Sequence, residues 1–150
     1  MNEVIVEQDI DAPAEKVWAM VSDVTRMGEW SPEATGAEWQ GGASGPAVGA
    51  KFKGLNRNGK RSWSTNCTVT ECEPAAAFAF KVAAGGLSIG TWSYRLTPTA
   101  TGCHVSETWT DTRGGIARFL GKFVSGVADR SAHNRSGMEQ TLGALAAAAQ

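Results

Sequence analysis

The sequence predicts an α+β fold in which a curved antiparallel β-sheet wraps around a long C-terminal helix, with two short helices after the first strand. Two observations predict this fold. Strand-like alternation of apolar and polar residues dominates the chain up to Asp111, and a helical period begins at Gly115. Because a helix with a broad apolar stripe and a sheet with one apolar face must cover each other, the simplest arrangement places the helix against the hollow of the sheet.

The composition fits one domain that covers residues 1–150. The chain is 42% hydrophobic and 19% charged, which is an ordinary globular balance. A net charge of −1 gives no reason to expect a nucleic-acid partner, and no apolar run reaches the roughly 18 residues of an integral membrane segment. The three cysteines lack metal-ligand spacing, so we expect no metal, no cofactor and a cytoplasmic location.

The N-terminal part of the chain predicts one strand and two short helices. Residues 3–10 alternate as a strand should. Asp11 is expected to cap the helix that follows it. A second short helix begins at Ser22 or Asp23 and ends before Ser31-Pro32, a pair that forces an extended or turn conformation.

Six further strands are expected, joined mostly by short turns. The clearest hairpin signal is Asn56-Arg57-Asn58-Gly59, because Asn-Gly tolerates positive φ at both central turn positions. Residues 41–49 form a loop rich in Gly, Pro and Ser. The expected strands cover residues 37–40, 51–55, 61–72, 78–82, 88–96 and 103–111.

The C-terminal region has helical periodicity. Either one long helix or a short helix followed by a long one fits the pattern, and Gly121 and Gly126 weaken the case for a single unbroken helix. With residues placed at about 100° steps, one apolar stripe emerges. Its members are Ile116, Phe119, Leu120, Phe123, Val127, Met138, Thr141 and Leu145.

Several stretches of the sequence resemble a known family. They are IDAPAEKVWAMVSD (residues 10–23), WSPE (30–33), VTECEP (69–74), GTWSY (90–94) and VADRSAHNRSGMEQTL (127–142). Together with the element order, they resemble the START/Bet v 1-like (SRPBCC) superfamily, and within it the polyketide cyclase/dehydrase-like branch of actinobacterial type. This resemblance spans nearly the whole chain. It implies a helix-grip fold with a cavity between the sheet and the long helix, in a group that includes lipid and polyketide binders and aromatase/cyclases.

Strand alternation predicts which side chains enter that cavity. In each long strand, the face that holds the large apolar residues is expected to point inward. These faces carry Trp63, Thr65, Cys67 and Val69, then Trp92, Tyr94 and Leu96, and finally Val105, Glu107 and Trp109, with Trp39, Phe52, Phe78 and Phe80 as further candidates. An aromatic chamber with a few polar groups is typical of a small-molecule pocket, and a filled core rich in tryptophan is the alternative.

Glu107 is the inward residue that needs a partner. A buried carboxylate costs several kcal/mol unless it is paired or protonated. Arg130 and Asn134 lie on or near the apolar stripe of the predicted helix, so they are the natural partners. Such a network either pins the helix to the sheet or grips a ligand oxygen. Tyr94 either donates a hydrogen bond to a ligand carbonyl or satisfies a backbone group.

The remaining reactive side chains suggest no catalytic pairing. His104 is expected on the surface and His133 on the flank or surface of the helix, whereas Cys67 is expected to pack inertly. A basic hairpin is typical of a solvated edge that resists strand pairing, with membrane contact during lipid loading as the alternative. Its residues are Lys51, Lys53, Arg57, Lys60 and Arg61.

The expected function is binding of a hydrophobic or aromatic small molecule, lipid-like or polyketide-like, by a monomer or weak homodimer. The expected ligand-binding residues are Trp63, Cys67, Trp92, Tyr94, Glu107, Trp109, Phe119, Phe123, Arg130, Asn134 and Met138. The first alternative is a polyketide aromatase/cyclase or dehydrase that uses Glu107 and Tyr94 as its acid–base pair. The second alternative is a protein-interaction or stress module in which the cavity is vestigial.

Overall fold

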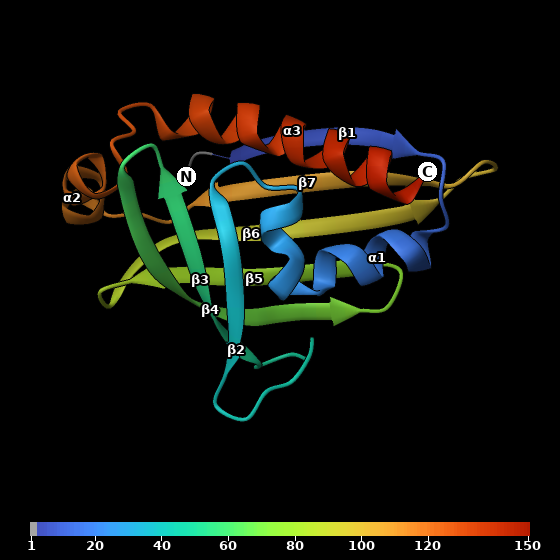
Figure 1. Ribbon diagram of the computed structural model, residues 1–150, viewed down its shortest axis with the longest axis horizontal. Helices are drawn as coiled ribbons and strands as arrows, with labels where there is room; N and C mark the ends of the chain where they lie inside the picture. The colour runs from blue at the N-terminus through green and yellow to red at the C-terminus, as the bar shows by residue number, and fades with distance from the viewer. Residues whose placement is uncertain (1–2) are drawn as a thin grey trace.

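The computed structural model describes residues 3–150 and confirms the expected helix-grip architecture (Figure 1). A seven-stranded antiparallel sheet curves around the C-terminal helix, and two short helices follow the first strand. In chain order the elements are β1 (Glu3–Ile10), α1 (Ala14–Ser22), the 3-10 helix η1 (Val24–Glu29), β2 (Ala34–Gln40), β3 (Lys51–Asn58), β4 (Arg61–Glu73), β5 (Ala77–Ala84), β6 (Leu87–Pro98), β7 (Cys103–Asp111), α2 (Gly115–Ser125) and α3 (Arg130–Ala149).

The strand order in the sheet is β1-β7-β6-β5-β4-β3-β2. From β2 to β7 each strand pairs with the next one along the chain, whereas β1 pairs with β7. The β3–β4 hairpin forms as the sequence predicted, but its turn lies one residue later, because Asn58 ends β3 opposite Arg61 instead of occupying a central turn position with positive φ. The loop residues are therefore Gly59 and Lys60, and of these only Gly59 has a positive φ, 62°. A glycine at the first central position suits this kind of two-residue hairpin turn.

The start of α1 differs from the prediction. Pro13 occupies the N-cap position without a side-chain hydrogen bond, so the expectation that Asp11 caps this helix is wrong. Proline presets a backbone angle close to that of a helical start, and α1 begins without a side-chain cap. The backbone N–H of Asp11 instead donates to Gln150 Oε1 at 2.9 Å, which ties this junction to the C-terminus. Asp23 caps η1 by accepting a hydrogen bond from the N–H of Thr25 at 3.2 Å.

The C-terminal region forms the short helix and the long helix that the sequence allowed. Gly126 ends α2 with a left-handed φ of 73°, and the Asp129 side chain caps α3 by accepting from Ala132 N at 3.1 Å. This break changes the helix axis, so the prediction of one continuous inward stripe is wrong for α2. Its four stripe residues are exposed, with exposed fractions of 69% for Ile116, 63% for Phe119, 46% for Leu120 and 63% for Phe123. The rest of the stripe, from Val127 to Leu145, is buried as predicted.

Helix α3 packs along one side of the concave sheet face. Met138, Leu142 and Leu145 are each at most 1% exposed, and α3 makes its sheet contacts with β1 and β7 (Figure 1). This arrangement leaves the concave face of β3 to β6 free to line a cavity. Within residues 3–150, no helix is both long enough and apolar enough to span a membrane.

Candidate functional site

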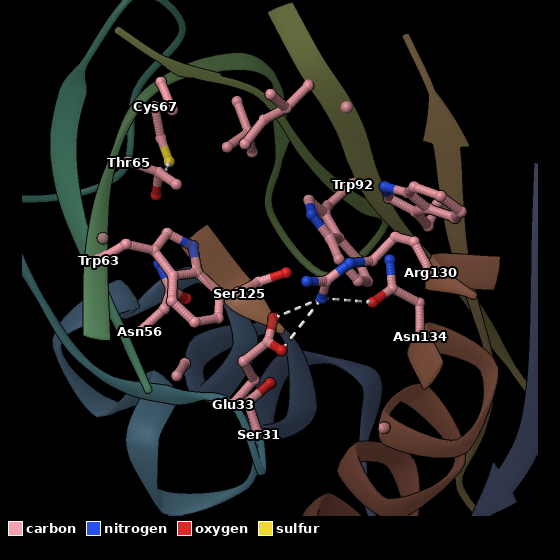
Figure 2. Close-up of a pocket in the computed structure, with 18 of the residues that line it drawn as sticks. Ser31, Glu33, Asn56, Trp63, Thr65, Cys67, Trp92, Ser125, Arg130 and Asn134 are labelled. Atoms are coloured by element: carbon pink, nitrogen blue, oxygen red, sulfur yellow. Dashed lines mark hydrogen bonds and ion pairs between the residues drawn. The ribbon is translucent and has the colours of Figure 1, made fainter. Parts of the chain in front are cut away.

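A cavity of about 440 Å³ lies between the concave face of the sheet and helices α2 and α3 (Figure 2). Its lining includes Phe52, Trp63, Cys67, Phe80, Trp92, Tyr94, Glu107, Trp109, Arg130, Asn134 and Met138. The volume falls within the usual range for small-molecule sites, and the mixture of aromatic walls with few polar groups is typical of them. The chamber can therefore enclose a small organic molecule.

The structure places all of the expected ligand-binding residues in this lining except Phe119 and Phe123. Those two side chains lie on the outer face of α2 because the helix axis changes at Gly126. Their assignment to the cavity is wrong. For the others, the position in the cavity is established and the role in binding stays a prediction.

The register between β6 and β7 creates the centre of the sheet-side wall. Trp92 lies opposite Trp109, with ring centroids 6.3 Å apart, and Tyr94 lies opposite Glu107. Alternation along each strand then brings both cross-strand pairs to the concave face. An aromatic pair and a hydrogen-bonding pair thus stand side by side in the cavity.

Glu107 is buried in this wall, with an exposed fraction of only 2%. The Tyr94 hydroxyl donates to its Oε2 at 3.0 Å, whereas Oε1 has no hydrogen-bond partner among residues 3–150. Burial raises the pKa of Glu107 to about 8, although the hydrogen bond from Tyr94 acts in the opposite direction. The carboxyl group is therefore mostly protonated at neutral pH.

A second polar cluster lies on the helix side of the cavity. Arg130 Nη1 donates to Glu33 Oε1 at 2.8 Å and to Asn134 Oδ1 at 3.3 Å. His133 Nε2 lies 2.9 Å from Glu33 Oε2. Figure 2 shows the Arg130 guanidinium between the Glu33 carboxylate and the Asn134 amide.

The prediction that Glu107 pairs with Arg130 and Asn134 is therefore wrong, although Arg130 and Asn134 do bond to each other. Glu107 bonds to Tyr94, and Arg130 finds its counter-charge in Glu33. The physical reason is that burial favours the protonated form of Glu107. A neutral carboxyl avoids the cost of a buried charge and needs no salt bridge. Glu107 with Tyr94 on the sheet side and Arg130 with Glu33 on the helix side are therefore two separate polar clusters of the cavity.

Sequence reasoning missed Glu33, which lies on the segment between η1 and β2. Its partner Arg130 is 97 positions away, and nothing in the local spacing connects the two. Both residues lie in stretches that resemble the family, WSPE (30–33) and VADRSAHNRSGMEQTL (127–142), and this was the available signal. His133 was expected on the flank or surface of α3, and it is half-buried, bonded to Glu33 and part of the lining.

Cys67 is placed as an inert part of the wall. Burial raises the pKa of its thiol to about 11, so the thiolate form is scarce at neutral pH. Its sulfur lies 3.6 Å from the Thr65 hydroxyl. Across residues 3–150, no three His, Cys, Asp or Glu side chains group so that they could hold a metal ion.

Comparison with known sequences identifies one family. A family model described as polyketide cyclase / dehydrase and lipid transport matches residues 1–150. No curated protein matches the sequence. A polyketide-cyclase-like protein from Corynebacterium glutamicum, solved by solution NMR, is 33% identical, with a TM-score of 0.64 over 96% of this chain and 88% of that chain.

More distant structures share the fold. A crystal structure of a protein from Mesorhizobium loti has 22% identity and a TM-score of 0.68, covering 97% of this chain and 95% of that chain. The di-domain ARO/CYC StfQ from the steffimycin biosynthetic pathway has 15% identity and a TM-score of 0.74, covering 98% of this chain but 50% of its own. At these identities, the likeness shows the architecture alone.

Proposed function

Because the chain belongs to the polyketide cyclase / dehydrase and lipid transport family, we propose that it binds a hydrophobic or aromatic small molecule that carries at least one carbonyl or hydroxyl oxygen. The molecule lies in the cavity between the concave sheet face and helices α2 and α3. One observation carries the proposal. The Glu107 carboxyl lines an aromatic cavity, and one of its oxygens has no hydrogen-bond partner among residues 3–150.

Apolar contact supplies most of the affinity in this proposal. Trp63, Trp92 and Trp109 present large aromatic surfaces to the cavity. Burial of apolar ligand surface contributes roughly 25 cal/mol per Å² before the costs of ordering the ligand. A planar, polycyclic or aliphatic ligand can pack against these side chains.

The Glu107–Tyr94 pair supplies the first polar contact. Because the Tyr94 hydroxyl donates to Oε2, the proton of the neutral carboxyl is free to be donated from Oε1. A buried donor without an acceptor costs about 1–3 kcal/mol. Oε1 is itself buried, so a ligand carbonyl accepts this proton after a small shift of the Glu107 side chain. Such a carbonyl removes the cost, whereas a hydrocarbon of the same shape does not.

The Arg130 cluster supplies the second polar contact. Arg130 uses Nη1 for Glu33 and Asn134, whereas no acceptor for Nε or Nη2 is found among residues 3–150. Since Glu33 already balances the guanidinium charge, a neutral ligand oxygen fits this position better than a second full negative charge. The two contacts together favour a ligand that has oxygen functions at two separated positions.

The first test identifies what the protein carries. Native mass spectrometry of protein purified from its own host, followed by extraction of any adduct, is expected to show a defined hydrophobic compound.

The second test uses two probes of matched shape, 1-tetralone and tetralin, which differ by one carbonyl. We expect 1-tetralone to bind roughly tenfold more tightly, as followed by quenching of tryptophan fluorescence.

Two variants test whether Glu107 causes the difference in affinity between 1-tetralone and tetralin. Glu107→Leu removes the donor and is expected to bring the two affinities together. Glu38→Leu, an exposed position on β2, is the matched control and should keep the difference. The ligand proposal is refuted if the purified protein carries no compound, takes up none from host extract and binds neither probe.

The second candidate is a polyketide aromatase/cyclase or dehydrase. It is favoured by one observation, a carboxyl with a pKa of about 8 beside a tyrosine in the wall of the cavity, because a general acid works best with a pKa near the operating pH. Glu107→Gln separates this candidate from simple binding. An enzyme should lose turnover of the extracted compound by 100-fold or more while still binding it, whereas a carrier shows no turnover with either protein.

A further inference from the structure

Helix α2 has small residues on its inner side and large apolar side chains on its outer side. On the inner side, Ala117, Gly121 and Ser125 recur at every fourth position and line the cavity. The outer side has no element packed over it among residues 3–150. We call this outer side the α2 apolar face. It comprises Ile116, Phe119, Leu120, Phe123 and Val124, which are between 46% and 69% exposed.

The α2 apolar face is continuous. The rings of Phe119 and Phe123 are 5.3 Å apart, one helical turn from each other. At about 100° per residue, Arg118 and Lys122 follow one flank of the face. Figure 1 shows α2 at the end of the molecule far from the C-terminus, so the face lies at an extremity of the fold.

Basic side chains from the β3–β4 turn adjoin the same helix. Asn58 Nδ2 donates to the carbonyl of Ser125 at 2.8 Å, and the Arg61 guanidinium donates to the carbonyl of Phe123. The turn also carries the exposed Arg57 and Lys60. The α2 apolar face is thus flanked by cations from two parts of the chain.

Acidic residues are missing from both of these segments. Neither residues 51–61 nor residues 112–128 contain Asp or Glu. Asp111, just before, is 2% exposed and already paired with Arg113 and Arg118. Since the whole chain has a net charge of −1, the surface outside this end carries the compensating negative charge. The molecule is therefore electrically polarised, with its positive end at α2.

We propose that α2 and the β3–β4 turn dock on anionic lipid membranes. A short helix with exposed phenylalanines and flanking lysine or arginine lies in the membrane interface, with its apolar face among the acyl chains and its cations at the headgroups. Anionic headgroups match the charge, and the interface accepts the whole apolar face at once. A second copy of the chain would bring two positive ends together, which disfavours self-association through this surface.

Docking has a geometric consequence for the cavity. Leu120 and Val124 belong both to the α2 apolar face and to the cavity lining. A docked α2 therefore places one wall of the cavity at the lipid surface, where a hydrophobic molecule can pass without crossing water. The docking itself does not depend on the proposed ligand function, because it uses the outer side of the helix.

The experiment is vesicle flotation with purified full-length protein. We expect binding to phosphatidylcholine vesicles that contain about one-third phosphatidylserine, little binding to pure phosphatidylcholine, and weaker binding as salt rises. The double variant Phe119→Ser/Phe123→Ser should lower the partition coefficient at least about tenfold. Lys60→Glu and Lys122→Glu should each lower it roughly fivefold or more.

Matched controls lie on other surfaces. Val48→Ser removes an exposed apolar side chain from the 41–49 loop, and Lys81→Glu reverses an exposed charge on β5. Both should bind vesicles as wild type does, and all variants should melt like wild type because the changed side chains are exposed. Wild-type protein that does not float with anionic vesicles would overturn the proposal, as would undiminished binding by the double phenylalanine variant.

One further outcome also decides against docking. A concentration-dependent dimer in light scattering that disappears in Phe119→Ser/Phe123→Ser, without vesicle binding, would assign the face to a second copy of the chain. None of these results changes the outcome expected for 1-tetralone and tetralin, so the docking proposal and the ligand proposal are tested independently.

Discussion

Replacement of Glu107 by glutamine should change stability in a way that depends strongly on pH. Glu107 is 2% exposed, and burial raises its pKa from an ordinary 4.5 to about 8. Glutamine has nearly the same shape, its amide oxygen can accept the hydrogen bond from Tyr94, and it does not titrate. The variant therefore removes the proton equilibrium of this group and preserves most of the packing.

The sign and size of this pH dependence of stability follow from proton linkage. In the unfolded chain the Glu107 carboxyl loses its proton near pH 4.5, whereas in the folded protein it keeps the proton up to about pH 8. The stability that this group contributes is complete below pH 4.5 and is lost as pH rises to about 8. The slope is about 1.4 kcal/mol per pH unit, so the total loss in wild type is at most roughly 5 kcal/mol.

The assay is urea unfolding of both proteins, followed by tryptophan fluorescence at several pH values between about 5 and 9. The difference in free energy of unfolding should move in favour of Glu107→Gln as pH rises to about 8, and should then level off. Other titrating groups are shared by both proteins and cancel in the difference. Glu38→Gln, at an exposed position, should show no such trend. A constant difference across the whole range would show that Glu107 is ionised in the folded protein, which refutes the reasoning.

Three other experiments test the packing. Gly102→Ala should lower the free energy of unfolding by at least about 2 kcal/mol, because a Cβ there would overlap the backbone that leads out of β1, whereas Gly36→Ala has open space and should cost much less. Asp111→Asn should cost about 1.5–3 kcal/mol in urea unfolding, since it removes the charge of a buried carboxylate that accepts hydrogen bonds from the partly exposed Arg113, and an unchanged midpoint would contradict this. A double-mutant cycle with Glu33→Gln and Arg130→Met should give a coupling energy of about 1–2 kcal/mol, and a value near zero would mean that the pair does not interact.

The sheet was predictable because strand alternation is a local property. In β7 the alternation of Val105, Glu107 and Trp109 with polar residues marks the inner face, and all three are at most 3% exposed. The Asn58-Gly59 pair located the β3–β4 turn in the same way, although the turn geometry itself differs from the expected one. What each strand lies beside depended on the family resemblance, since alternation does not specify partners.

The parts that could not be predicted depend on contacts between distant segments. The partner of Glu107 is set by the β6–β7 register, which places Tyr94 directly opposite, and charge pairing alone pointed to the wrong residue, Arg130. The outward position of Phe119 depends on the break at Gly126, because a helical wheel assumes one straight axis. A wheel cannot show where the axis turns.

The strand order also governs how the chain can fold. β2 to β7 form a meander in which every pairing closes between neighbours in the sequence, but β1 reaches its partner only when Glu3 meets Thr110. The entropy cost of closing a loop grows with its length, and distant pairings slow folding. We therefore expect the meander to form first and β1 to join it last, with α3 packing over β1 at that step. Although β1 precedes the other strands in the sequence, it is therefore the last to pair, and pulse-labelled hydrogen exchange should find its amides protected last.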